Sequence, residues 1–283
     1  MSQTCAWYDR ALSMKTVATA ALAALISSSH ALHAQRASRP AGTAAPAAKA
    51  PTTPRVERQV PFRVGETLTY DVSWSSYLTA GSAAVVVKEK KPSYNSTAYY
   101  IVAEGRPTPL LSKLYTLYYK LDTLLDSYTL LPQRGSVYSE EGKRHRFKTT
   151  QFDRGAKKIF FEYRADTTVK ADFPTSPVTQ DALSAIYVLR AIPLKAGDRM
   201  TMPVSDNGIN YKVQFEVARQ ERVRTALGDQ SAWKLNLSVF DDRNAPVGRN
   251  VAIWIGDDAR RLPLKLQADL PVGSFNLALR SAS

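Results

Sequence analysis

The sequence predicts an all-β fold: one large antiparallel sheet or barrel, with a single main helix packed on it. From residue 61 onward, apolar residues mostly alternate with polar ones at a period of two, as in strands. Turn signals such as Asp206-Asn207-Gly208 separate the alternating segments at intervals of roughly ten to twenty residues. One stretch, about residues 179–190, instead repeats its apolar residues at helical spacing. A lone helix among many strands is expected to pack against the sheet.

The amino end has the pattern of a signal peptide over residues 1–34, with the start at Met1 or at Met14. Its apolar run, Val17–Ile26, is too short to span a bilayer as a helix. Small residues offer a cleavage position after Ala34. We therefore expect an exported protein, in the periplasm or associated with the outer membrane. The single cysteine, Cys5, precedes the apolar run, so no lipid-anchored cysteine is expected.

Residues 35–60 are rich in Ala, Pro and Arg and show no periodicity, which predicts a disordered tether. Residues 61–283 form the predicted β domain, with no repeat and no second domain break. We expect roughly eleven short strands at this spacing. They lie over residues 65–74, 82–88, 98–103, 115–125, 144–152, 158–163, 199–204, 233–239, 251–255, 262–268 and 274–279, with a further strand that opens at Leu131-Pro132 and an alternating segment formed by Val213, Phe215 and Val217. A short helical or irregular bridge is expected at 110–114.

The predicted helix at about 179–190 has Thr179 as its expected N-cap and Asp181 in its first turn, where an acidic group suits the helix dipole. Pro193 is expected to stop it. Along it Leu183, Ile186, Tyr187 and Arg190 recur at three- and four-residue spacing, and Ala182, Ala185 and Leu189 widen the apolar stripe.

The formal net charge is +13, of which +5 falls within residues 1–60, so the β domain carries +8. Such a surface favours anionic partners, including an anionic membrane surface. Nucleic acid is not expected, because the chain has no Lys/Arg-rich run and no nucleic-acid-binding motif. A solvated basic surface without a specific partner remains an equal alternative.

Three blocks of sequence resemble one bacterial family. They are Gly65–Trp74 with Ala80-Gly81, Gln180–Arg190 with Gly197, and Val251–Pro263 with Gly273-Ser274. Their content and order resemble domain of unknown function 3108, over about residues 61–283. The resemblance implies an exported envelope protein with one antiparallel β domain and no assigned activity. By fold analogy, we expect a single curved sheet or half-open β-barrel with the helix on its concave side, similar to periplasmic lipoprotein carriers.

Residues that could perform catalysis or bind metal occur without the partners that such chemistry needs. His145 lies in a basic hairpin, and Ser184 lies within the predicted helix without a nucleophile elbow. Asp257-Asp258 lack the ligand spacing of an EF-hand, and Glu140-Glu141 resemble a hairpin tip. No phosphate-binding glycine motif is present. We predict no catalytic residue, no metal site and no cofactor, and lean against an enzyme.

The function that these features favour is non-enzymatic binding of an apolar or lipid-like ligand in a half-open barrel, with the helix as lid or plug. The predicted lining residues are Trp74, Tyr115, Tyr119, Leu183, Ile186, Tyr187 and Trp254. The alternative is a structural or interaction protein of the cell envelope with a solid core and no small ligand. The identity of a ligand, protein partners and the oligomeric state stay open at this stage.

Overall fold

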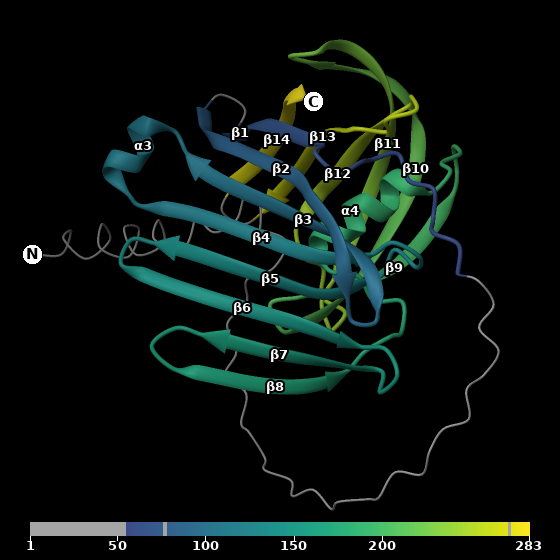
Figure 1. Ribbon diagram of the computed structural model, residues 1–283. Helices are drawn as coiled ribbons and strands as arrows, with labels where there is room; N and C mark the ends of the chain where they lie inside the picture. The colour runs from purple at the N-terminus through teal and green to yellow at the C-terminus, as the bar shows by residue number, and fades with distance from the viewer. Residues whose placement is uncertain (1–54, 76–77, 271–272) are drawn as a thin grey trace, which may run out of the picture.

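The computed structural model describes residues 55–75, 78–270 and 273–283 (Figure 1). The predicted signal peptide and residues 35–54 of the predicted tether lie outside the described residues. The elements are β1 Thr67–Trp74, β2 Leu78–Ser93, β3 Ser96–Pro107, α3 Pro109–Leu114, β4 Leu117–Asp126, β5 Pro132–Glu141, β6 Arg144–Asp153, β7 Lys158–Arg164, β8 Thr168–Pro174, α4 Ala182–Ala191, β9 Arg199–Asp206, β10 Ile209–Thr225, β11 Gly228–Phe240, β12 Arg249–Gly256, β13 Pro263–Leu270 and β14 Gly273–Ala282.

All fourteen described strands belong to one antiparallel sheet, in the order β8-β7-β6-β5-β4-β3-β2-β1-β14-β13-β12-β11-β10-β9. The sheet therefore consists of two meanders, β1 to β8 and β9 to β14, joined where the first strand pairs with the last. In that pairing Tyr70 lies opposite Leu279, and Val72 lies opposite Leu277. The predicted all-β, single-sheet architecture is confirmed.

This strand order explains where the helix lies. The two edge strands, β8 and β9, are consecutive along the chain, so the segment that joins them must cross from one edge of the sheet to the other. That segment contains α4. The sheet is strongly curved, and α4 lies in its hollow, between the strands β3–β5 and the strands β9–β12 (Figure 1). The predicted position of the helix on the concave side is thus a consequence of the topology.

The two edges of the sheet come close together without pairing as strands. The Asn210 side chain donates to the Pro174 carbonyl at 3.0 Å, and Lys148 Nζ donates to Asn207 Oδ1 at 2.5 Å. Just before α4, Gln180 forms an isolated parallel bridge with Val204 of β9. The sheet is therefore a half-open barrel whose seam is held by side chains and by the segment leading into α4.

The core lies between α4 and the inner face of the curved sheet. Leu183 and Tyr187 pack with residues of β3 and β4, whereas Leu189 packs with residues of β10, β11 and β12. One helix therefore contributes to the hydrophobic clusters of both meanders. The strand partners are Ile101, Leu121 and Leu125 in the first cluster and Phe215, Leu235 and Ile253 in the second.

Three details differ from the sequence-based expectations. The edge strand β8 is an addition to the expected set: Val169, Ala171 and Phe173 alternate with polar residues, but the segment is short and almost all of its residues are exposed. The strands β2 and β10 are longer than expected, since bulges let them bend and continue. The N-cap of α4 is Asp181 rather than Thr179, and the helix begins at Ala182, because Asp181 and Ser184 form a capping box.

Residues 55–60, which belong to the predicted tether, lie along the end of the sheet near β4. The Arg58 backbone N–H donates to the Ser127 carbonyl at 2.9 Å, and Glu57 accepts from Ser127 Oγ at 3.0 Å. The helices of the described residues all fall short of the length and apolar content that crossing a membrane requires.

Candidate functional site

A cavity of about 190 Å³ lies between α4 and the inner face of the sheet. None of its lining side chains carries a formal charge, and the polar side chains among them are those of Tyr70, Tyr187, Tyr211 and Gln267. An apolar cavity of about 150 Å³ in another protein stays dry and can bind benzene, so this space is large enough for an apolar group. The helix contributes Ala182, Leu183, Ala185, Ile186, Tyr187 and Leu189, and the strands contribute Leu68, Tyr70, Met202, Phe215, Leu237, Ile253, Leu266, Phe275 and Leu277 among others.

The helix presents an apolar face to this cavity because its apolar residues recur every three or four positions. Its small residues matter as much as its large ones. Ala182 and Ala185 line the cavity beside Ile186, and the short alanine side chains leave space that larger residues would occupy. The volume of the cavity therefore depends on alanine at these positions.

The C-terminal end of α4 is fixed by a buried ion pair. Arg190 is fully buried, and its two terminal nitrogens donate to the two carboxylate oxygens of Glu66 at 2.6 and 2.8 Å. Arg190 also donates to the carbonyls of Arg260 and Arg261 at 3.1 Å each. Burial disfavours the charged guanidinium, but the bonds to Glu66 outweigh it and raise the pKa of Arg190. The charge is therefore retained and tied to the start of β1.

The Arg261 side chain completes this attachment from the other direction. Its guanidinium donates to the carbonyls of Arg190 and Ile192 at 2.7 and 2.8 Å. These two carbonyls belong to the last turn and the C-cap of the helix, where backbone acceptors lack helical partners. A cation at this end also suits the helix dipole.

The N-terminal end of α4 is held by the buried carboxylate of Asp181. One oxygen accepts from the Ser184 backbone N–H at 2.7 Å, and the other accepts from Thr123 Oγ1 of β4 at 2.6 Å. Burial raises the pKa of Asp181, while the bonds from Ser184 and Thr123 oppose that change. Arg154 fixes the segment before the helix by donating to the Thr179 carbonyl at 2.9 Å.

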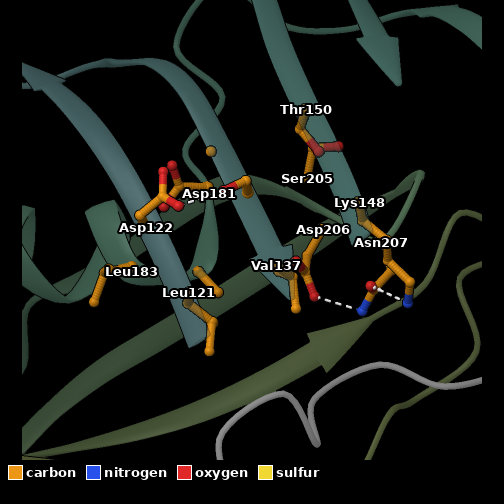
Figure 2. A pocket seen from close by; sticks show the side chains of 13 residues that line it. Leu121, Asp122, Val137, Lys148, Thr150, Asp181, Leu183, Ser205, Asp206 and Asn207 are labelled. Carbon is orange, nitrogen blue, oxygen red and sulfur yellow. Dashed lines mark hydrogen bonds between the residues drawn. The ribbon is translucent and has the colours of Figure 1, made fainter. Parts of the chain in front are cut away.

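A small polar pocket lies beside this N-cap, at the seam between the two meanders. Figure 2 shows Asp181 on one side of it and Asp206, Asn207 and Lys148 on the other. Its volume is about 20 Å³, enough for one water molecule. Burial raises the pKa of Asp206 to about 6, and burial also lowers the pKa of Lys148.

The pocket at the seam has no arrangement for hydrolysis or metal binding. The described residues contain no cluster of three or more His, Cys, Asp or Glu placed to hold a metal ion. Asp181 is occupied by its helix and by Thr123, and Asn207 Nδ2 donates to Asp206 at 2.8 Å. The side chains around the pocket can hold the seam closed, and the net charge of the pocket can change near pH 6, where Asp206 titrates.

Three buried tyrosines, Tyr70, Tyr187 and Tyr211, are among the cavity-lining residues, and the first two differ in their hydrogen bonding. The Tyr70 hydroxyl donates to the Pro263 carbonyl at 3.0 Å. The Tyr187 hydroxyl has no hydrogen bond of acceptable geometry within the described part of the chain. Burial raises the pKa of all three phenols well above the usual value, so they stay protonated near neutral pH.

Of the seven residues predicted to line a ligand site, Leu183, Ile186 and Tyr187 line the cavity. The other four, all aromatic, lie elsewhere. Tyr119 is buried against Leu121 and donates to Glu141. Trp254 lies between Lys234 and Lys265 and donates to Glu221.

Tyr115 packs against the turn at Gly142, and Trp74 lies against Gly273. Their aromatic character predicted burial, but it did not specify which side of the sheet or which cluster each would join. Strand residues that do line the cavity include Met202, Phe215 and Leu237. They alternate like other core residues, and this pattern alone does not distinguish a cavity lining from a packed core. The signal in the sequence that could have identified them is their alternation, which places them on the inward face of strands in the β9–β14 meander.

The side chains rejected as catalytic candidates occupy the places that turns and hairpins give them. His145 is exposed and lies 3.2 Å from the Tyr138 hydroxyl. Asp257 accepts from Trp233 Nε1 at 2.7 Å, and Asp258 accepts from the Arg261 backbone N–H at 2.8 Å. Each of these contacts stabilises a strand end or a turn.

The model of DUF3108, a family of proteins of unknown function, matches residues 69–280. No curated protein matches the chain. Among solved structures, a beta-barrel-like protein of domain of unknown function DUF1849 from Brucella abortus is similar, with a TM-score of 0.48 and 11% identity over 78% of this chain and 97% of that chain.

Two further solved structures are similar at lower TM-scores. An inferred exported protein with a YmcC-like fold from Bacteroides fragilis has a TM-score of 0.33 and 11% identity over 81% of this chain and 100% of that chain. An inferred lipoprotein from Parabacteroides distasonis gives 0.35 and 7% identity over 81% of this chain and 100% of that chain.

Proposed function

The chain belongs to the DUF3108 family, and we propose that it is an exported, non-enzymatic protein that binds an apolar or lipid-like ligand in the cavity beneath α4. The observation that carries the proposal is the cavity itself, because well-packed protein interiors seldom leave so large an apolar space. Export rests on the signal-peptide pattern of residues 1–34.

The chemistry of the lining indicates the class of ligand. Since no charged side chain lines the cavity, the part of the ligand that enters it is uncharged and apolar. The volume fits a ring or a segment of an acyl chain, and not a whole phospholipid. A longer ligand would leave its polar end outside the cavity.

The attachment of α4 at both ends also supports a binding role. The Asp181 cap and the Arg190–Glu66 pair hold the helix at a fixed height above the sheet. A cavity with such supports exists before the ligand arrives, so binding does not require the helix to be ordered at the same time. These contacts support the proposal that α4 is a fixed wall of the cavity, in place of the lid or plug expected from the sequence.

The alternative is an interaction protein without a small ligand, and the exposed edge strand β8 favours it. All but one of the residues Thr168–Pro174 are exposed, and β8 pairs only with β7 among the described strands. Such an edge can accept a strand from a partner.

The proposal is tested with the uncharged apolar fluorophore N-phenyl-1-naphthylamine. We expect saturable binding to the purified protein, competition by fatty acids, and loss of binding in Ala268→Phe, which fills the cavity from β13. The matched control is Ala278→Phe on β14, whose strand partners Asp71 and Lys265 place it on the other face of the sheet. Equal binding by both variants, or none by the wild type, would contradict the proposal.

A further inference from the structure

The short helix α3 exposes two leucines that the fold does not use. None of its residues is buried, and Leu110 and Leu114 are 72% and 79% exposed. The two leucines are four positions apart, so they lie on the same side of the helix. Exposed leucines are ordinary when they are scattered, but a pair on one protruding element indicates a contact surface.

Helix α3 is held firmly at one end of the sheet, beyond the ends of β3 and β4 (Figure 1). Before the helix, the Thr108 backbone N–H donates to the Ala80 carbonyl of β2 at 2.9 Å. After it, the Gly142 backbone N–H in the β5–β6 turn donates to the Thr116 carbonyl at 2.8 Å. The leucines are thus presented by a fixed element, and the β5–β6 turn lies next to it.

The charges around α3 are positive and unneutralised. Lys113 on the helix and Lys143 and Arg144 at the β5–β6 turn are exposed, and none of the three has a carboxylate partner in the described part of the chain. The acidic residues nearby are already engaged: Glu104 with Arg106 at 3.7 Å, Glu141 with Arg146 at 3.1 Å, and Glu140 with the Tyr138 hydroxyl at 2.7 Å. We call Leu110, Lys113, Leu114, Lys143 and Arg144 the α3 platform.

We propose that the α3 platform docks the protein on an anionic lipid surface. Leu110 and Leu114 enter the boundary between head groups and acyl chains, while the three cations contact lipid phosphates. Charge complementarity selects this occupant, because unpaired cations beside exposed leucines match a negatively charged apolar boundary. A protein partner would have to supply both a leucine pocket and several carboxylates in one place.

Docking here is independent of the cavity, since the α3 platform and the cavity lining share no residue. A protein that docked without binding an apolar probe, or bound the probe without docking, would separate the two proposals. When both hold, the platform brings the cavity to the membrane that supplies or receives an apolar ligand.

The test is flotation with vesicles of phosphatidylglycerol and phosphatidylethanolamine in equal parts, compared with vesicles of phosphatidylcholine. We expect binding to the anionic vesicles that weakens with salt. Leu110→Ser with Leu114→Ser should weaken it about tenfold or more, and replacing Lys113, Lys143 and Arg144 by Gln should weaken it roughly fivefold for each charge removed. Because all five side chains are exposed, thermal unfolding should be unchanged.

Matched controls lie at the opposite end of the sheet. Val64→Ser with Leu227→Ser removes two exposed apolar side chains there. Replacing Lys195, Arg219 and Arg222 by Gln removes three further cations, so both triple variants have the same net charge. The proposal is overturned if these controls weaken binding as much as the platform variants do. It is also overturned if neutral vesicles bind equally well, or if the leucine variant changes self-association in sedimentation velocity and leaves vesicle binding intact.

Discussion

Removing the carboxylate of Glu66 should be among the most destabilising single changes in this protein. In Glu66→Gln, Arg190 stays fully buried but loses the carboxylate that pairs with it. The remaining neighbours of its guanidinium are the carbonyls of Arg260 and Arg261 and the rings of Phe62 and Tyr187. These groups cannot neutralise a charge, so the cost of burying it is no longer offset.

The magnitude follows from the behaviour of buried pairs. Breaking one by removing a single partner typically lowers the free energy of unfolding by about 3–5 kcal/mol. The introduced glutamine amide can still accept one hydrogen bond, which favours the lower end of that range. With a urea dependence of about 3 kcal/mol per molar for a domain of this size, the midpoint of unfolding should fall by roughly 1 M.

The assay is urea unfolding followed by tryptophan fluorescence, with Glu57→Gln as the matched control. Glu57 pairs with Lys90 at the surface, so the same substitution there should leave the midpoint almost unchanged. The double variant Glu66→Leu with Arg190→Met should be more stable than Glu66→Gln, because it buries no charge. A Glu66→Gln midpoint equal to that of the Glu57→Gln control would refute the reasoning.

Three further predictions concern the seam, the cavity and the strand packing. Burial raises the pKa of Asp206 from 3.8 to about 6, so the folded state binds more protons than the unfolded state between these pH values, and the free energy of unfolding should fall by about 3 kcal/mol as pH rises through that window. Asp206→Asn should abolish this fall in urea titrations at several pH values. An unchanged pH dependence in the variant would exclude Asp206 as its source. Tyr70→Phe should lower the free energy of unfolding by about 1 kcal/mol, because it loses the hydrogen bond to the Pro263 carbonyl. Tyr187→Phe should leave stability nearly unchanged, because the Tyr187 hydroxyl lacks a hydrogen bond to the described residues. Equal losses of stability in thermal unfolding would contradict this contrast. Gly81→Ala should lower the melting temperature of the protein strongly, because the added Cβ would lie 2.2 Å from the Arg106 carbonyl oxygen. A melting temperature equal to that of the wild type would show that β2 and β3 can move apart at this position without a loss of stability.

The elements of the fold could be predicted where local pattern and burial coincide. Strands with one buried face alternate visibly, and α4 has a stripe that strands cannot produce. The edge strand β8 escaped prediction because its alternating apolar set is short, only Val169, Ala171 and Phe173, and little of the strand is buried. The predicted N-cap of α4 was wrong by two residues, since Thr179 and Asp181 are both good capping residues. The pairing of Gln180 with Val204 and the extended dihedral angles of Asp181 show that the backbone is not yet helical there.

The candidate site could be predicted only in part, for a physical reason. The helix residues Leu183, Ile186 and Tyr187, predicted from the sequence, line the cavity because an amphipathic helix turns its apolar face toward the sheet. Aromatic residues on strands are buried for several reasons, so Tyr119 and Trp254 joined other clusters. The pair formed by Glu66 and Arg190 joins residues 124 positions apart and has no local signal in the sequence.

The polar attachments of α4 explain how an apolar cavity can persist beneath it. A helix held by apolar contacts alone would be expected to settle until the space was filled, because close packing is favourable. Here Asp181 is tied to Thr123 at one end and Arg190 to Glu66 at the other, and both pairs are buried. Moving the helix inward would break bonds whose partners have no access to water, and that cost opposes closer apolar packing. Loosening this attachment by Glu66→Gln should therefore weaken binding of the apolar fluorophore at urea concentrations where the protein is still folded.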